Sequence, residues 1–336
     1  MLKLKLYKEV MRKLLFSIGV ILTVILPSDV VHTQSNEPSI SYLGNYPSDK
    51  WGSWTERLQG VGNNHDSWFF TQKEVLWKVP LSINLDNSKN MWPGRSGFPG
   101  VLRVEMPEVL KREGFDHFGD LDALNGYIFI PIERSSTETP AIGVFREDDL
   151  SFVSYALLKN RTRSGWCSIT PNGQLFTSHN KIDSNNPIDV YDIDWETLRN
   201  QGKLNLKFSH NFYLTGIPKE YGESLSPYIQ GGDFSTDGKY LFLLNGKTGI
   251  NETHSRGIWM FKNDNYKWGV FVTKSIQDGQ NFRYEYKPAL LQEPEGITYW
   301  DIDPYGSPEV GGQLHALLLN IRYRKDSIWF KHYRLR

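Results

Sequence analysis

The segment Asp233-Phe-Ser-Thr-Asp237-Gly238-Lys-Tyr-Leu-Phe242 decides the fold of this chain. Its Asp-Gly pair supplies the positive φ angles that a tight hairpin turn requires, and an apolar, aromatic strand follows the turn. Two other segments repeat this pattern, Asp122-Ala-Leu-Asn125-Gly126-Tyr-Ile-Phe-Ile130 and Ser168-Ile-Thr-Pro-Asn172-Gly173-Gln-Leu-Phe176. Weaker copies lie before Trp68 and before Gln313, and no long helical period occurs after residue 35. The sequence therefore predicts an all-β protein built from repeats.

The repeat divides the chain into five units of short strands, each long enough for a four-stranded blade. The last unit has only three strands before the chain ends, and residues 39–56 are available to supply the fourth. We therefore predict a five-bladed β-propeller over residues 36–336, a single domain closed by an N-terminal strand that leaves only short sheet edges. A six-bladed ring and, more distantly, a pair of β-sandwiches are the alternatives.

The repeated phrase (Asp/Ser)-x-x-x-(Asp/Asn)-Gly-x-x-(Leu/Phe) resembles the hairpin phrase of the β-propeller superfamily, which includes the YncE-like, TolB-like, NHL and gluconolactonase groups. It is clearest at residues 233–242 and 168–176, and the resemblance covers residues 57–333. The phrase implies the architecture and assigns no specific functional family, because one fold serves many functions.

Residues 1–35 differ in composition from the rest of the chain. A basic leader that includes Arg12 and Lys13 precedes an uncharged apolar run, Leu14 to Leu26, which Pro27 ends. This order is typical of a secretory signal peptide, and the run is shorter than the roughly 20 residues of a membrane-spanning helix. We expect a secreted or periplasmic protein with no membrane span in the mature chain. An uncleaved N-terminal anchor is the alternative.

Charge and cysteine content narrow the class of partner. Lys plus Arg and Asp plus Glu each number 38, so the formal net charge is zero. Nucleic-acid-binding proteins usually carry a basic excess, so we expect no nucleic-acid partner. The single cysteine, Cys167, permits no internal disulfide and is most simply a small buried apolar residue. The oligomeric state is not indicated.

The repeat also predicts where a binding site lies. If the Asn-Gly and Asp-Gly turns join the first strand of each unit to the second, the opposite face gathers the starts of the first strands and the ends of the second strands. Polar or aromatic residues occur at these places in every unit, beside glycines that let the backbones approach the axis closely. The expected ligand-binding residues are Gln59, Gln72, Asp120, Glu133, Trp166, His179, Asn180, Gln230, Asn245, Glu295 and Asn320.

Three of these residues, Asp120, Glu133 and Glu295, are carboxylates, and like charges gathered in one concavity favour a bound cation. The Glu295-Gly296 pair also resembles the Glu-Gly pair of gluconolactonase-like propellers, in which the glutamate binds a metal. That resemblance implies a divalent cation such as calcium at Glu295, with Asp120 and Asn245 as partners. The family's pair lies in its first blade, whereas this one lies in the last.

Three functions follow from these features. The first is a binding propeller whose axial pocket takes a small polar molecule or a carbohydrate, with Trp166 available for stacking. The second is a cation-dependent hydrolase or lactonase that uses Asp120, Glu133 and Glu295. The third is an interaction module of the cell envelope that recognises another protein through an exposed patch of Trp51, Trp54 and Trp92. No known catalytic motif decides whether the chain is an enzyme.

Overall fold

A computed structural model describes residues 38–336, apart from 52–53, 65, 136–137, 160, 223–224, 226–227, 247–255, 277–281, 285–291 and 321–326, and apart from the side chains of 48–51. The predicted signal peptide lies outside the described residues. Pro38–Arg336 forms one compact unit. Within the described part, no helix is both long and apolar enough to cross a lipid bilayer.

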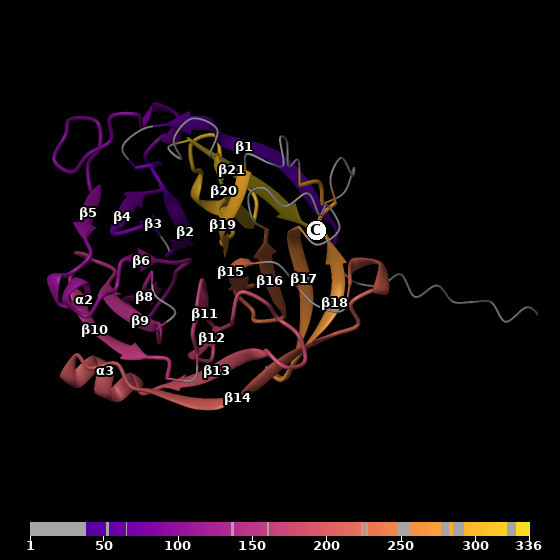
Figure 1. The fold of residues 1–336 in the computed structure, drawn as a ribbon. Coiled ribbons are helices and arrows are strands. Elements are labelled where there is room, and N and C mark those ends of the chain that lie inside the picture. Colours follow the sequence, from indigo (N-terminus) through magenta and orange to yellow (C-terminus); the bar gives the residue numbers. More distant parts are fainter. Residues whose placement is uncertain are drawn as a thin grey trace, which may run out of the picture. The chain divides into compact units, whose positions relative to one another are not determined.

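The described strands form five four-stranded blades around one axis (Figure 1), in each of which successive strands pair antiparallel. The first blade contains β2 (Leu58–Asn63), β3 (Ser67–Gln72), β4 (Val75–Pro80) and β5 (Leu102–Glu105). The second contains β6 (His117–Phe118) with β7 (Asp122–Leu124), β8 (Tyr127–Glu133), β9 (Ala141–Arg146) and β10 (Phe152–Leu157). The third contains β11 (Cys167–Ile169), β12 (Gln174–Thr177), β13 (Ile188–Ile193) and β14 (Leu206–Thr215). The fourth contains β15 (Ile229–Phe234), β16 (Tyr240–Asn245), β17 (Gly257–Asp264) and β18 (Trp268–Lys274).

The fifth blade joins both ends of the described chain. It contains β19 (Gln292–Tyr299), β20 (Leu314–Asn320), β21 (Ser327–Leu335) and, on its outside, β1 (Ile40–Trp51). β1 pairs antiparallel with β21, and Ser39 and Arg336 exchange two backbone hydrogen bonds of 2.8 and 2.9 Å. The predicted five-bladed propeller, closed by an N-terminal strand, is confirmed.

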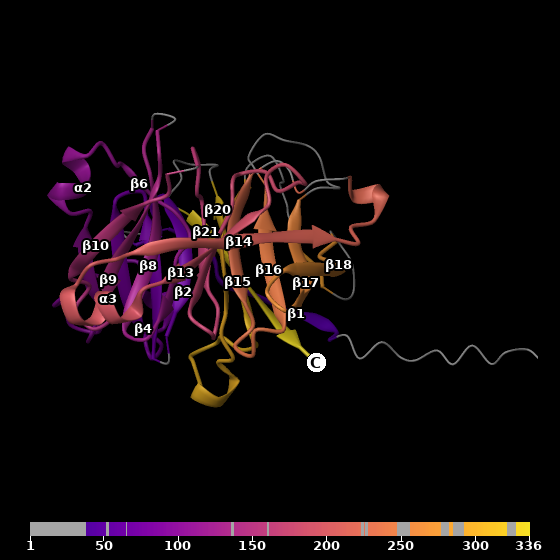
Figure 2. The ribbon, with the colours of Figure 1, turned by 90° about the horizontal axis from the view of Figure 1, so that it is seen from below.

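The outer strands of two blades are also joined, which the sequence did not predict. β14 pairs parallel with β18 over Tyr213–Thr215, so the third and fourth blades form one eight-stranded sheet. Figure 2 shows β14 running along the outside of the ring from one blade to the next. This pairing protects two edges that would otherwise be open to association with another chain.

Short helices lie in the connections rather than in the blades. They are η1 (Leu85–Asn87), α2 (Glu108–Arg112), α3 (Trp195–Gln201), η2 (Lys219–Tyr221) and η4 (Asp303–Tyr305).

Apolar side chains fill each interface between neighbouring blades. Between the fifth and first blades, for example, the rings of Trp68 and Phe330 meet at 5.2 Å and nearly at right angles. Between the third and fourth, Phe176 and Phe234 meet at 4.9 Å. Because both faces of a blade are covered by its neighbours, the strands read as nearly continuous apolar runs, and β3 is buried along its whole length.

The first strand of each blade lies against the axis, where β2, β7, β11, β15 and β19 contact one another in a ring. Asp120 lies at the centre of this ring and is fully buried. Its Oδ1 accepts a hydrogen bond from the backbone N–H of Val61 (2.9 Å), and its Oδ2 accepts from Ile297 (3.2 Å) and Gly232 (3.3 Å). Its own backbone pairs with the third blade through Gly165 and Cys167. One residue thus joins all five blades.

The crowding at the axis explains the glycines beside it. A Cβ atom on Gly296 would lie 2.5 Å from Oδ1 of Asp120 and 2.7 Å from the backbone nitrogen of Val61. Neither atom can move far, because both belong to the central hydrogen-bonded ring. The predicted need for glycine in the first strands is confirmed at this position.

A second polar ring lies nearer the hairpin turns and takes one residue from each blade. Asn63 donates to Thr298 (2.6 Å), and Thr298 donates to Asp233 (3.2 Å). The Ser168 hydroxyl lies 2.9 Å from Asp233 and 3.1 Å from Asp122. Ser168, Asp233 and Asp122 are the first residues of the three repeated phrases, so that position of the phrase connects blades.

Candidate functional site

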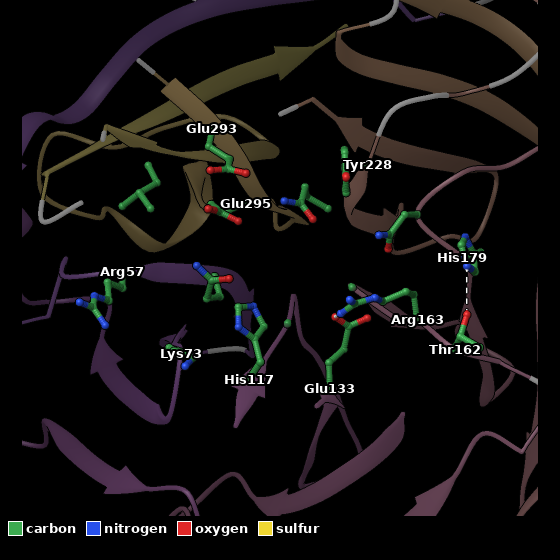
Figure 3. A pocket seen from close by; sticks show the side chains of 16 residues that line it. Arg57, Lys73, His117, Glu133, Thr162, Arg163, His179, Tyr228, Glu293 and Glu295 are labelled. Carbon is green, nitrogen blue, oxygen red and sulfur yellow. Dashed lines mark hydrogen bonds and ion pairs between the residues drawn. The ribbon is translucent and has the colours of Figure 1, made fainter. Parts of the chain in front are cut away.

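A cavity of about 930 Å³ opens at the end of the axis where the first strands begin, and we call it the axial cavity (Figure 3). All five blades contribute to its wall. Its lining residues are Arg57, Gln59, Lys73, His117, Gly119, Glu133, Thr162, Arg163, Gly165, His179, Asn180, Tyr228, Gln230, Glu293, Glu295 and Leu319. Apart from two glycines and a leucine, every one of them carries a polar or charged group.

Six of the eleven predicted site residues line this cavity. They are Gln59, Glu133, His179, Asn180, Gln230 and Glu295. Three of the six lie in the first half of first strands, and three at or beyond the ends of second strands. The structure therefore brings together residues from both of the positions that the repeat indicated.

The other five predicted residues lie outside the cavity lining: Gln72, Asp120, Trp166, Asn245 and Asn320. Two of them are hydrogen-bond partners of buried tryptophans. Gln72 accepts from the indole of Trp77 (2.9 Å), and Asn245 accepts from that of Trp259 (2.9 Å). A buried indole N–H needs an acceptor, and the end of the second strand supplies one.

Trp166 is itself a buried tryptophan, and its indole N–H donates to the Ser178 hydroxyl at 2.7 Å. It is fully buried and has no free face for stacking on a ligand. Asn320, 7% exposed at the end of β20, follows the lining residue Leu319 but is not part of the lining itself.

The lining residues form two tiers that sequence reasoning did not separate. The lower tier contains the predicted first-strand starts Gln59, Gly119, Gly165, Gln230 and Glu295. The upper tier contains the residue two positions earlier in each blade: Arg57, His117, Arg163, Tyr228 and Glu293. None of these five belongs to the eleven predicted residues. Each lies two positions before a predicted first-strand start, and this constant spacing is the signal that would have found them; Arg57 and Tyr228 themselves have positive φ angles.

Glu133 is a carboxylate of the wall that is held by two hydrogen bonds. Arg163 donates to its Oε2 at 3.0 Å, and the backbone N–H of Ser164 donates to its Oε1 at 2.6 Å. Glu133 ends β8 in the second blade, whereas Arg163 precedes β11 in the third, so this ion pair also joins two blades. Figure 3 shows the pair beside His117, with Glu293 and Glu295 across the cavity.

Two imidazoles lie in the wall, and the pKa of each is below that of a free histidine. Burial lowers the pKa of His117, and the nearby Glu133 carboxylate only partly offsets this effect. Burial also lowers the pKa of His179, with Arg161 adding to the shift. Nε2 of His179 lies 3.3 Å from the Thr162 hydroxyl, and its Nδ1 is buried without a hydrogen-bond partner. Both rings are therefore neutral at pH 7, when one nitrogen donates and the other accepts.

The predicted cation site gains no support from the geometry. The Asp120 carboxylate is enclosed by backbone N–H groups and has no exposed surface. Among the residues that the structure describes, no group of three or more His, Cys, Asp or Glu side chains is placed to hold a metal ion. A divalent cation bound by Asp120, Glu133 and Glu295 thus stays a prediction.

The tryptophans of the expected interaction patch do not form a common surface. Trp54 is 1% exposed and donates to the Ser88 hydroxyl at 2.8 Å, whereas Trp92 is 42% exposed. Trp92 packs edge-on against Trp77, and the Arg103 guanidinium lies 4.8 Å from its ring centre. The side chain of Trp51 lies outside the described residues.

Solved structures match this chain in fold, but no sequence family matches it. No protein-family model matches the chain, and no curated protein matches it. Among solved structures, the Swd1 β-propeller domain of Myceliophteria thermophila matches with 9% identity, covering 82% of each chain with a TM-score of 0.40. Native arabinanase of Bacillus subtilis matches with 9% identity over 87% of this chain and 97% of that one, with a TM-score of 0.42. Hydrazine synthase of Kuenenia stuttgartiensis matches with 12% identity over 86% and 90%, with a TM-score of 0.39.

Proposed function

We propose that this chain is an exported binding protein whose axial cavity takes a small polar ligand, and that a carbohydrate is the ligand class. The observation that carries the proposal is the two-tier wall, in which every blade presents a polar side chain to the same space. A sugar hydroxyl both donates and accepts hydrogen bonds, so its binding site needs donors and acceptors side by side. Arg57 and Lys73 only donate, Glu293 and Glu295 accept when ionised, and the amides do both.

The balance of charge supports the same ligand class. Three basic and three acidic side chains line the cavity, and the two imidazoles are neutral. A strongly anionic or cationic ligand would face about as much repulsion as attraction. An uncharged, hydroxyl-rich ligand meets strong charge-assisted hydrogen bonds without that penalty.

The size of the cavity sets the size of the ligand. Ligand pockets commonly have volumes of about 300–1,000 Å³, so a cavity of about 930 Å³ accommodates a short oligosaccharide. Tyr228 is the one aromatic side chain among the lining residues. With Trp166 buried, we expect hydrogen bonding rather than stacking to supply most of the affinity, and therefore a favourable binding enthalpy.

A glycan array followed by calorimetric titration of the best ligand tests the proposal. We expect Gln230→Ala and Arg57→Ala each to weaken binding by about tenfold, which corresponds to ~1.4 kcal/mol for a lost polar contact. Gln174→Ala is the matched control, because Gln174 lies in β12 and bonds Asp192 outside the axial cavity. Absence of saturable glycan binding, or equal affinity of all three variants, would contradict the proposal.

Hydrolysis of the bound ligand is the second candidate function for the same cavity. The neutral imidazole of His117 beside the anchored carboxylate of Glu133 favours it, because such a ring can accept a proton from water at pH 7. Chromatography of the titrated mixtures is the test. Products that form with the parent chain and not with His117→Gln would establish hydrolysis, whereas intact ligand would leave the chain a binding protein.

A further inference from the structure

A second cavity lies at the opposite end of the same first strands, where the hairpin turns gather, and we call it the turn-face cavity. Its volume is about 680 Å³. β2 runs from Gln59 in the axial cavity to Asn63 in this one, and β15 runs likewise from Gln230 to Phe234. Asp120 closes the axis between the two cavities, which share no lining residue. In Figure 2 the gold segment that contains η4 projects from this face of the ring.

The turn-face cavity carries negative charge without compensation. Four carboxylates line it, Asp122, Glu147, Asp233 and Asp301, and its lining contains no Lys, Arg or His. None of the four forms an ion pair with a described basic residue. Their partners are neutral donors instead: Glu147, for example, accepts from the Asn64 amide at 3.0 Å. The axial cavity differs in this respect, because Arg163 neutralises its Glu133.

Two of these carboxylates show the effect of that uncompensated charge. The single hydroxyl of Ser168 lies within hydrogen-bond distance of both Asp122 and Asp233, and it has only one proton to donate. Burial and the mutual repulsion of the two groups raise the pKa of Asp122 well above its ordinary value, and burial raises that of Asp233 to about 6. A positive charge in the cavity would relieve this repulsion.

Aromatic rings complete the wall. Tyr299, Trp300 and Tyr305 all line the cavity, and the rings of Trp300 and Tyr305 lie 6.0 Å apart at an angle of 48°. Trp300 is only 6% exposed, because its ring also packs edge-on against Trp68. Aromatic faces beside carboxylates are the chemical surroundings in which proteins bind organic ammonium groups.

We propose that the turn-face cavity binds an organic cation with an ammonium head group. The aromatic rings and the carboxylates attract the cationic head, and a bound cation favours the ionised forms of Asp122 and Asp233. This site is independent of the ligand in the axial cavity. Its occupant is a different class of molecule, because the two walls differ in charge and in aromatic content.

Calorimetric titration of the whole chain with choline, tetramethylammonium and the uncharged carbon isostere of choline tests the proposal. We expect saturable binding of both cations and none of the isostere. Tyr305→Ala and Asp301→Asn should each weaken choline binding by about three- to tenfold, in the range of a single cation–aromatic or charge contact. Both side chains are exposed, so both variants are expected to fold.

Glu309→Gln is the matched control, because it removes an exposed negative charge nearby that is not part of the cavity lining. It should leave choline affinity unchanged, as should saturation of the axial cavity with a glycan. Equal binding of choline and its isostere, unchanged affinity in Tyr305→Ala and Asp301→Asn, or binding of calcium ion in place of either organic cation would overturn the proposal.

Discussion

Replacement of Asp120 tests whether one carboxylate holds the five blades together. In Asp120→Ala, the backbone N–H groups of Val61, Gly232 and Ile297 lose their acceptor inside the protein, where water cannot replace it. Each buried, unsatisfied donor costs about 1–3 kcal/mol. Burial of the carboxylate itself costs free energy and raises its pKa. Asp120→Ala removes that cost, which offsets part of this sum. We expect the free energy of unfolding to fall by about 3–5 kcal/mol.

Asp120→Asn separates the loss of an acceptor from the loss of packing. An amide oxygen in the place of Oδ2 keeps the bonds from Gly232 and Ile297, and the amide nitrogen then faces the N–H of Val61 at the 2.9 Å contact. One bond of three is lost, so the expected cost is about 1–2 kcal/mol. Asp192→Asn, which changes an exposed carboxylate of β13, should stay within about 0.5 kcal/mol of the parent.

Urea unfolding followed by tryptophan fluorescence and circular dichroism measures these differences, and coincident transitions establish two-state behaviour. Hydrogen exchange locates the effect: protection should fall first in the peptides that contain β2, β15 and β19. The reasoning is refuted if Asp120→Ala unfolds within about 1 kcal/mol of the parent and these strands keep their protection. The reasoning is also refuted if Asp120→Asn lowers the free energy of unfolding as much as Asp120→Ala does.

Two further predictions concern the same axis. The folded pKa of Asp233, about 6, lies above its ordinary 3.8, so its contribution to stability is fully present below pH 3.8 and is lost as the pH rises through 6. Asp233→Asn should therefore remove a fall of about 3 kcal/mol from the profile of unfolding free energy between pH 4 and 7, and it should also lower the pKa of Asp122, which the charge of Asp233 helps to raise. An unaltered profile would exclude this contribution. Gly296→Ala places a Cβ 2.5 Å from Asp120 and should lower the melting temperature by several degrees, whereas Gly165→Ala, with its nearest contact at 3.2 Å, should lower it less. Thermal unfolding monitored by circular dichroism compares the two, and the reverse order would contradict the crowding argument.

The sequence was sufficient to predict the architecture because each repeat contains residues that favour a tight backbone turn. Asn125, Gly126 and Gly173 take the positive φ angles of tight turns, and the apolar strands after them are buried. Closure by β1 followed from simple counting of strands. The parallel pairing of β14 with β18 had no such signal, because it joins strands from two repeats at their outer edges.

The candidate site was harder to predict for two physical reasons. Polar side chains at the ends of second strands serve either a ligand or a buried indole, and the sequence does not separate Asn180, which lines the cavity, from Asn245, which holds Trp259. The sequence also marks Asp120 as one more carboxylate on the rim. Only the surrounding backbone N–H groups show that its role is to join the blades.

The two polar levels of the axis explain where function lies in a propeller of this kind. The level that contains Asp122, Ser168 and Asp233 repeats the same kind of residue in successive blades, because each must reach the next blade with a hydrogen bond. In the upper tier of the axial cavity Arg163 also bonds another blade, through Glu133, but the five blades present four kinds of side chain there: Arg57 and Arg163, His117, Tyr228 and Glu293. A small asymmetric ligand needs different groups on its different sides, which identical repeats cannot supply. Positions at which the repeat holds are thus explained by assembly of the ring, and positions at which the residue type varies between blades are where binding specificity is to be sought.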